Sequence, residues 1–206
     1  MRTQVPSRVF QTLAAMPPHT TPFDLQPHLT GELLELRPLN EGDFAGLFAV
    51  AADPLIWEQH PDRDRCQEPV FRQFFRDALV SQGALVAIDR ATGRIIGSSR
   101  FHGDSDATAE IEIGWSFLGR AYWGGRYNGE MKRLMLEHAF RWVEHVLFII
   151  GSDNRRSRRA VEKIGGTYSR TICDDGGLER VVYALTPQQH ARRRADTTLD
   201  AIEKLV

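Results

Sequence analysis

The chain has 206 residues, of which 42% are hydrophobic and 26% are charged, values typical of globular domains. This length suits one domain with a single well-buried core, and the composition excludes a wholly disordered or fibrous chain. The 26 basic and 27 acidic residues give a formal charge of -1, which argues against bulk attraction to nucleic acid or to an anionic membrane.

The cysteines and the N-terminal residues indicate the cellular compartment in which the protein is expected. Cys66 and Cys173 lie far apart and form no CxxC pair, so the sequence indicates neither a zinc site nor a redox motif. We therefore expect reduced thiols and no bound metal. No apolar run is long enough to cross a membrane, and the first residues lack the apolar stretch of a secretion signal. These features predict a cytoplasmic protein with no membrane partner.

Three regions follow one another along the chain. Residues 1–30 are punctuated by prolines and are interpreted as an N-terminal extension, because proline discourages long regular structure. Residues 31–186 carry the hydrophobic periodicity of one folded domain. Residues 187–206 are expected to form a C-terminal helix, with Thr186 as its cap and Pro187 at its first position.

The periodicity of the central region predicts alternating strands and helices. Strands are expected at 34–37, 84–88, from 94, at 108–117, 146–150, 168–173 and 180–185. Helices are expected from the Asn40 cap through Val50, at 69–81, after Gly124-Gly125 and at 155–164.

This order predicts an α/β fold with a mixed sheet flanked by helices. The 108–117 strand, the following helix and the 146–150 strand form an expected β-helix-β crossover, which makes the two strands parallel. The second of these strands is nearly all apolar, which suits burial on both faces. Along the first strand, alternation assigns one face to Ile111, Ile113 and Trp115 and the other to Glu110, Glu112 and Gly114.

The turn before the long helix is rich in glycine and reads Trp123-Gly124-Gly125-Arg126-Tyr127-Asn128-Gly129-Glu130. Glycines let the backbone approach a ligand, and the first amides of a helix are unsatisfied donors that favour phosphate or pyrophosphate. Arg126 would add a charged donor. The turn is neither a GxGxxG dinucleotide motif nor a Walker A loop, and a purely structural role for its glycines stays open.

A second motif runs from Asp153 to Gly166. It starts at the carboxyl end of a buried strand, where α/β sheets favour ligand sites. Asn154 and Ser157 lie one helical turn apart, so both side chains are expected to face one cleft. The arginines of this segment are interpreted mainly as a solvated helix face, with contact to phosphates left open for one or two of them. Nucleic-acid binding through this helix is the alternative, and nothing else in the chain supports it.

Together the two motifs resemble those of the GNAT superfamily of N-acetyltransferases, in particular the branch with the ribosomal-protein N-terminal (alanine/serine) acetyltransferases. The resemblance covers about residues 33–185. Tyr122–Tyr127 is similar to the Y-W-G-x-G-Y loop of this branch, with Arg126 in place of the second glycine and Ala121 where the family has Gln or Arg. The segment 154–166 matches the family pattern N-x-x-S-x-x-A-x-E-K-x-G-G.

The resemblance implies a single GNAT-like domain in which the two parallel strands splay apart and receive the pantetheine of acetyl-CoA. It implies acetyl-CoA as co-substrate, with no metal. Phe117 would offer backbone contacts to the pantetheine, and Asn154 and Ser157 would line the thioester side. The pyrophosphate would be held by Trp123, Gly124, Gly125, Arg126, Tyr127 and Asn128.

The implied reaction is direct transfer to a primary amine in a ternary complex, which needs a base for the amine and a proton for the departing thiolate. Glu112 lies where the family often has a carboxylate and is the candidate base. Glu110, two residues away, is expected to raise the pKa of Glu112. The alternative is that both glutamates simply face solvent. The position of the family's acidic tyrosine is Val161 here, which leaves Ser157 as the candidate proton donor.

The acceptor amine is expected to be a protein N-terminus or a small molecule. Trp57, His60 and Arg100 are candidate contacts to it, with His102 and Arg63 as further candidates, although packing explains Trp57 and His60 equally well. Arg100 or Arg63 would be the residue that holds a carboxylate group on the substrate. A hypothesis of a different class is a GNAT-like domain that binds acyl-CoA or a partner protein without catalysis. The sequence leaves the oligomeric state open, a homodimer included.

Overall fold

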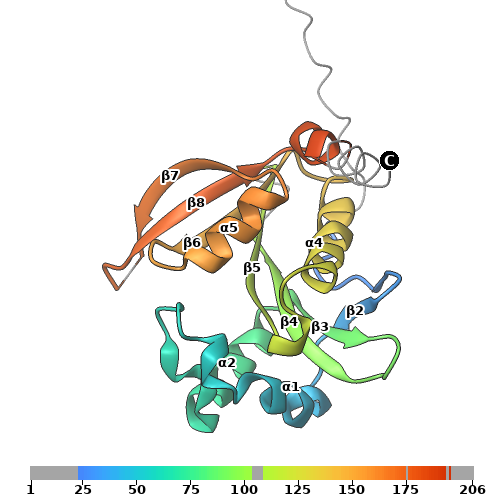
Figure 1. The fold of residues 1–206 in the computed structure, drawn as a ribbon, viewed down its shortest axis with the longest axis vertical. Coiled ribbons are helices and arrows are strands. Elements are labelled where there is room, and N and C mark those ends of the chain that lie inside the picture. The colour runs from blue at the N-terminus through green and yellow to red at the C-terminus, as the bar shows by residue number, and fades with distance from the viewer. Residues whose placement is uncertain (1–22, 104–108, 175, 194, 196–206) are drawn as a thin grey trace, which may run out of the picture.

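The computed structural model describes residues 23–103, 109–174, 176–193 and 195 (Figure 1). Most of the expected N-terminal extension and the end of the expected C-terminal helix lie outside these residues. The strands are β1 (Leu29–Thr30), β2 (Leu34–Pro38), β3 (Ala84–Asp89), β4 (Ile95–His102), β5 (Glu110–Leu118), β6 (His145–Gly151), β7 (Thr167–Cys173) and β8 (Glu179–Leu185). The helices are α1 (Phe44–Ala51), α2 (Glu68–Val80), α4 (Arg126–Ala139) and α5 (Arg155–Lys163). Short 3-10 turns lie at Glu41–Asp43, Pro54–Ile56, Arg63–Cys66 and Arg120–Tyr122.

The eight described strands form one mixed sheet in the order β1-β2-β3-β4-β5-β6-β8-β7. Each neighbouring pair is antiparallel except β5 and β6, which are parallel and joined through α4. The expected β-helix-β crossover is therefore confirmed. The expected α/β fold with a mixed sheet is confirmed as well.

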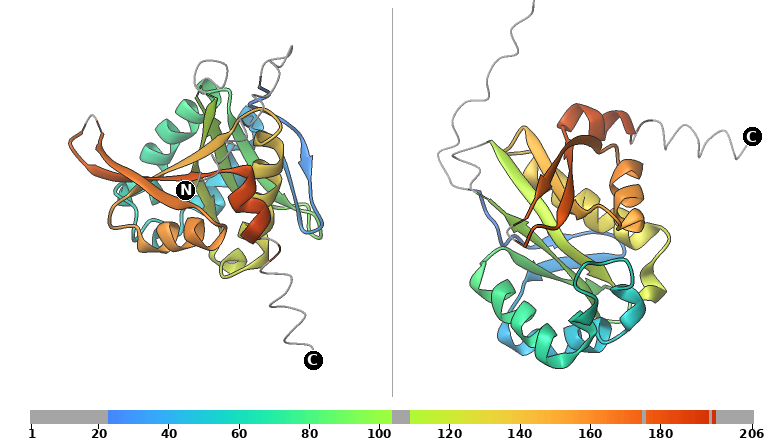
Figure 2. Two further views of the ribbon diagram at one scale, coloured as in Figure 1. Left: turned by 90° about the horizontal axis from the view of Figure 1, so that it is seen from above. Right: turned by 90° about the vertical axis from the view of Figure 1, so that its left-hand side faces the viewer.

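Helices cover both faces of the sheet and create two hydrophobic cores. Figures 1 and 2 show α1 and α2 together on one side, away from α4 and α5. The apolar stripe of α2 (Phe71, Phe74, Phe75 and Ala78) packs with α1 and with Trp57 and Phe117. On the other face, the α4 stripe of Met131, Leu134 and Met135 packs on strands β2 to β6 and β8. Burying one such side chain stabilises the fold by about 1.5–3 kcal/mol.

The ends of the elements follow the capping residues in the sequence. Asn40 Oδ1 accepts from Gly42 N at 3.0 Å and opens the turn that leads into α1. The helix at 187–193 starts as expected, because Thr186 and Gln189 exchange side-chain-to-backbone hydrogen bonds in a capping box. Gly165, with a φ of +100°, follows α5 in a left-handed conformation that favours glycine.

Two details of the sheet differ from the sequence prediction. The two-residue strand β1 is not predicted, because it is too short to show a period. The expectation that β6 is buried on both faces was wrong. Val146, Phe148 and Ile150 are buried, whereas Leu147 and Ile149 between them are half-buried. The opposite face of β6 is less covered because the strand borders an opening in the sheet.

Candidate active site

The opening lies between β5 and β6. The two strands pair only where Glu110–Glu112 faces His145–Leu147; beyond that, β5 continues along β4 and β6 continues along β8. Within the described part of the chain, Ile113–Leu118 and Phe148–Gly151 therefore form no ladder with each other. Unpaired backbone groups at such an edge are suited to pair with an extended ligand.

A β-bulge in β5 decides which side chains enter this gap. Trp115 and Ser116 together lie opposite Ser99 of β4, and Trp115 has a φ of +50°. The extra residue reverses the alternation, so Trp115 packs with the core under α1 and α2, whereas Ile111 and Ile113 belong to the core under α4. The expectation that these three residues share one face was wrong for that reason.

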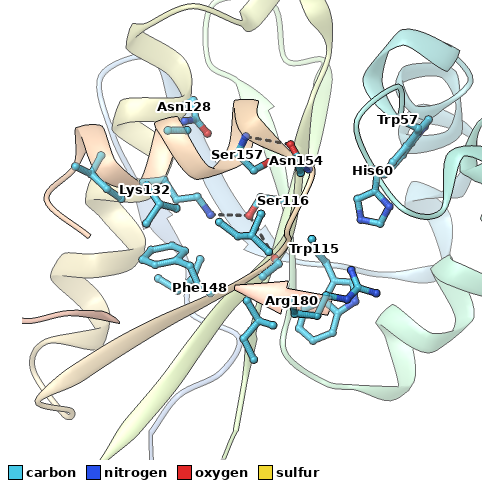
Figure 3. Close-up of a pocket in the computed structure, with 18 of the residues that line it drawn as sticks. Trp57, His60, Trp115, Ser116, Asn128, Lys132, Phe148, Asn154, Ser157 and Arg180 are labelled. Carbon is cyan, nitrogen blue, oxygen red and sulfur yellow. Dashed lines mark hydrogen bonds between the residues drawn. The ribbon is translucent and has the colours of Figure 1, made fainter. Parts of the chain in front are cut away.

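The side chain of Lys132 on α4 reaches into the gap between β5 and β6. Its Nζ donates to Ser116 Oγ on β5 at 2.6 Å and lies 5.4 Å from the centre of the Phe148 ring on β6 (Figure 3). Ser116 Oγ lies 2.7 Å from Ser99 Oγ, so the ammonium group reaches a chain of two hydroxyls. Lys132 is only 7% exposed, and burial lowers its pKa to about 7.

Glu112 lies at the closed end of the gap. A Cβ on Gly114 would be only 2.7 Å from Glu112 Oε1, so the carboxyl group lies against Gly114, which lines the gap. Burial raises the pKa of Glu112 to about 7, and the charges of Arg100 and Lys132 partly oppose that rise. Burial, and not the charge of Glu110 that the sequence suggested, is therefore the main cause.

Two adjoining cavities occupy the opening. An inner cavity of about 150 Å³ lies between Gly114–Ser116, Lys132 and Arg180. An outer groove of about 890 Å³ runs along Phe117 and the N-termini of α4 and α5. The residues that line both are Trp57, His60, Ser116, Asn128, Asn154, Ser157, Ala160 and Ile164.

The N-termini of α4 and α5 face the outer groove. Before α4, Gly124 has a φ of +82°, and a Cβ added to Gly124 or Gly125 would meet no atom within 4 Å. The backbone here is thus open to the groove. At α5, Asn154 Oδ1 accepts from Ser157 N at 3.1 Å and Gln59 Oε1 accepts from Arg156 N at 3.1 Å, so side chains cap the first turn of this helix.

This architecture coincides with a known family. Residues 34–167 match the family model described as acetyltransferase (GNAT) domain. The chain belongs to the GNAT acetyltransferase family. The YkkB protein of Bacillus subtilis is 33% identical over 151 residues, which cover 70% of this chain and 87% of YkkB.

Solved structures of GNAT proteins share the fold. A GCN5-related N-acetyltransferase from Brucella melitensis has a TM-score of 0.70 at 19% identity, with 82% of this chain and 85% of that chain covered. RimJ of Mycobacterium smegmatis, in complex with CoA-disulfide, has a TM-score of 0.57 at 16% identity, with 80% and 89% covered. Family membership identifies the chain as a GNAT-type N-acetyltransferase, and the likeness to these structures shows the fold.

The residues of the turn that was expected to hold pyrophosphate fall into two groups. Trp123, Gly124, Gly125 and Asn128 line the outer groove. Arg126 is exposed and is not among the groove residues. Tyr127 instead donates from its hydroxyl to Asp89 Oδ1 at 3.0 Å and packs on Tyr122, so it holds α4 to the β3–β4 hairpin. The structure thus brings only part of the predicted set to the groove.

Trp123 is held in place at the groove by two contacts. Its Nε1 donates to Leu118 O at 2.8 Å, and the Arg156 guanidinium lies 4.1 Å from the centre of its ring. Arg156 also donates to Ile56 O at 2.6 Å, which ties α5 to the α1–α2 connection across the opening. These contacts make Arg156 a structural bridge, and not the solvated residue that the sequence suggested.

Asn154, Ser157 and Phe117 all border the opening. Asn154 is 6% exposed, and Ser157 is half-buried beside it. Among the described residues, no hydrogen-bond partner is found for Ser157 Oγ, so this hydroxyl is available to a ligand. The Phe117 ring is buried against Trp57 with ring centres 5.1 Å apart, which leaves its backbone as the part that faces the groove.

The candidate acceptor contacts lie at the inner cavity or beside it. Trp57 is 3% exposed and donates from Nε1 to Ala51 O at 2.7 Å, and it also lines the cavity. It therefore packs in the core and forms part of the cavity wall. His60 Nδ1 accepts from Asp62 N at 2.9 Å, and burial lowers the pKa of His60 to about 4, which makes it neutral at pH 7. Arg100 lies behind Trp115, at 4.6 Å from its ring.

The two further candidates are peripheral. The His102 ring contacts the Trp115 ring at 5.5 Å between centres, and Arg63 is exposed on the turn before α2; neither lines the cavities. The described residues contain no group of three side chains able to hold a metal ion. In the same part of the chain, no helix is long and apolar enough to cross a membrane.

Sequence reasoning missed several cavity residues, namely Arg65, Ser116, Lys132 and Arg180. Their signals are weak because each lies in a different element and only the fold brings them together. For Lys132 one signal was present. It occupies the position after Met131 in a stripe of apolar residues, next to the buried face of α4. A lysine in that position is expected to be paired or functional, since lysine is rarely buried.

Proposed function

We propose that this GNAT protein transfers an acetyl group from acetyl-CoA directly to a primary amine in a ternary complex. The observation that carries the proposal is the splayed β5–β6 edge, with the Glu112 carboxyl of raised pKa at its closed end. A carboxyl group with a pKa near 7 is suited to general base catalysis at neutral pH. The inner cavity and the outer groove meet at Ser116, which gives amine and thioester separate approaches to one point.

The outer groove suits acetyl-CoA, which would supply an activated acyl thioester. Open space at Gly124 and Gly125 and the first amides of α4 are suited to a pyrophosphate, and the unpaired edge of β5 after Ile113 is suited to pantetheine amides. The RimJ structure with CoA-disulfide supports the assignment by analogy of fold.

The chain's own residues would handle the protons. Glu112 would accept the proton released by the attacking amine, directly or through water. As the N–C bond forms and the C–S bond breaks, the departing thiolate needs one proton. Ser157, with its unpaired Oγ, is the proposed donor, and Ser116, backed by Lys132 Nζ, is a second hydroxyl near the same point.

The test is calorimetric titration with acetyl-CoA, followed by thiol release in the presence of an amine panel. We expect saturable binding that Gly125→Asp weakens at least tenfold, because a carboxylate in the groove would repel the pyrophosphate. Gly93→Asp is the control, since Gly93 lies in the distant β3–β4 turn, where a Cβ also meets nothing within 4 Å, and aspartate tolerates its φ of +67°. Binding without amine-dependent thiol release would contradict the catalytic proposal, and absence of binding would contradict all of it.

A further inference from the structure

His60 lies where the outer groove meets the inner cavity, and its side chain lines both. The ring points from the loop before the Arg63–Cys66 turn toward the opening, and the side chain is 25% exposed (Figure 3). Neither of the proposed proton transfers uses this ring. A polar side chain at such a place is a candidate for contact with the reacting thioester.

The loop that carries His60 is attached to the two elements that border the opening on this side. Gln59 Oε1 accepts from Arg156 N at 3.1 Å, which ties the loop to the first turn of α5. Pro61 packs on the end of β6, because a Cβ added to Gly151 would lie only 3.0 Å from Pro61 Cγ. The ring is therefore held in place before any ligand binds, which is the condition for an effective catalytic donor.

Hydrogen bonding fixes the position of the proton on the His60 ring. Nδ1 accepts from Asp62 N at 2.9 Å, so this nitrogen carries no hydrogen. Burial is the main cause that lowers the pKa of His60 to about 4, and the neighbouring charges that lower it further are those of Arg65, Arg180 and Arg156. Asp62 has the opposite effect on this pKa and does not outweigh them. The ring is thus neutral at pH 7, and its single proton lies on Nε2.

The Nε2–H group of His60 has no acceptor among the described residues. Its neighbour is Nη1 of Arg65 at 3.3 Å, and a guanidinium nitrogen can only donate. Arg65 is kept there by its ion pair with Asp62 and by the Phe74 ring, whose centre lies 4.6 Å from the guanidinium carbon. The other tautomer would only transfer the conflict to Asp62 N, which would then face an Nδ1–H group. Two donors therefore converge on one point beside the cavity, where an oxygen atom of a ligand would accept from both.

We infer that the Nε2–H of His60, with the Arg65 guanidinium beside it, donates to the carbonyl oxygen of the thioester and stabilises the oxyanion that forms when the amine attacks. The inference rests on the proposed acetyl transfer. The carbonyl electron pair moves onto oxygen as the N–C bond forms and returns as the C–S bond breaks, so His60 keeps its proton throughout. Because the oxyanion carries more charge than the thioester carbonyl, this hydrogen bond is strongest in the transition state and raises kcat. A neutral ring suits the task, since it does not compete with Glu112 for the proton of the amine.

The experiment compares two variants of similar side-chain length, His60→Gln and His60→Met, of which only the first carries an N–H group near the position of Nε2. With acetyl-CoA and the best amine of the panel, His60→Met should lower kcat about 10²–10³-fold, the usual effect of one lost oxyanion donor. His60→Gln should keep at least about ten times the kcat of His60→Met, and acetyl-CoA affinity should change less than about threefold in both, because the ground-state contact is weak.

The matched control is His102→Met, because His102 contacts Trp115 outside both cavities; its kcat should stay within about twofold of that of the unaltered protein. Equal losses of kcat in His60→Gln and His60→Met would assign the ring to packing and overturn the inference. An unchanged kcat in His60→Met would overturn it too, and both outcomes would leave acetyl transfer intact.

Two further measurements distinguish donation by a neutral ring from base catalysis. The limb of kcat/KM near pH 7 is assigned to Glu112, so His60→Gln should keep it; loss of this limb would make His60 the base and overturn the inference. In the unaltered protein, nitrogen NMR of the imidazole at pH 7 should show a neutral ring with its proton on Nε2. A cationic ring, or a proton on Nδ1, would overturn the inference without the use of a variant. No amine-dependent turnover by the unaltered protein would overturn both this inference and the proposed function.

Discussion

The outer groove and the inner cavity belong to one opening but are built differently. Backbone groups contribute to the groove at the unpaired edge of β5, at the glycines before α4 and in the first turn of α4. The cavity is formed by side chains from the Arg63–Cys66 turn, the loop before it and β5, α4, β6, α5 and β8, among them Trp57, Lys132 and Arg180. A backbone site suits the groups that are common to CoA thioesters, the proposed ligands. A side-chain site can change its substrate without changing the fold, so acceptor identity has to be inferred from the cavity alone.

The largest expected effect is on the chemical step. Glu112→Gln should lower kcat by about 10²–10⁴-fold, because it removes the proposed base and keeps the shape. Acetyl-CoA affinity, measured by calorimetry, should stay the same, since Glu112 does not line the groove. Glu110→Gln is the matched control. A Glu112→Gln variant with normal turnover would remove Glu112 from the mechanism.

An intermediate effect is expected from the groove backbone. Gly124 has a φ of +82°, a conformation that costs a β-branched residue about 1–2 kcal/mol. Gly124→Val should therefore distort the turn and weaken acetyl-CoA binding about tenfold, with the acceptor KM unchanged. Gly177→Val, at a φ of +75° in the β7–β8 turn, carries the same strain away from the groove. If both variants lost affinity equally, the effect would be one of stability.

The pH profile should show whether Lys132 acts on the pKa of Glu112 or serves only in packing. With a Glu112 pKa of about 7, kcat/KM should fall as pH drops below 7, because the base becomes protonated. The positive charge of Lys132 lowers the Glu112 pKa, so Lys132→Met should move this limb to higher pH, by about half a unit to one unit. Lys132→Arg should keep the limb near its original position. A lower rate with an unmoved limb would assign Lys132 to packing alone.

The smallest expected effect concerns the wall of the groove. Trp123→Leu removes the stacking of Arg156 on the indole ring, an interaction of about 0.5–1 kcal/mol at an exposed site. Acetyl-CoA affinity should fall about two- to fivefold by calorimetry, and the choice between acceptors should not change. A change in acceptor preference would show that groove and cavity are coupled.

The sequence was sufficient for the groove and for most of the fold. Helices and strands from Leu34 to Leu185 have clear periods, and the groove motifs are continuous in the chain, so helical spacing placed Asn154 beside Ser157 and the family resemblance placed Gly124 at the same site. Arg126 and Tyr127 belong to the same turn but do not line the groove, because successive residues at the start of a helix point in different directions.

The cavity could not be predicted in the same way. Arg65, Arg100 and Arg180 are separated by long stretches of chain; Arg100 was a candidate contact, whereas Arg65 and Arg180 each look like an ordinary surface cation in the sequence. Only the sheet order and the packing of α2 bring two of them to the Phe74 ring. The pKa of Glu112 was expected to rise through its neighbour Glu110, whereas its burial depends on the complete fold.

The bulge at Trp115 has a further consequence for sequence change in this protein. Before the bulge the odd-numbered residues of β5 face α4, and after it the even-numbered residues do, so the bulge shifts the alternation of the strand by one residue. Deleting Trp115 would restore regular pairing, with Ser116 alone opposite Ser99 and still beside Lys132. Deleting Ser116 instead would turn Trp115 toward α4 and remove the hydroxyl partner of Lys132, so two neighbouring one-residue deletions have opposite consequences for the site.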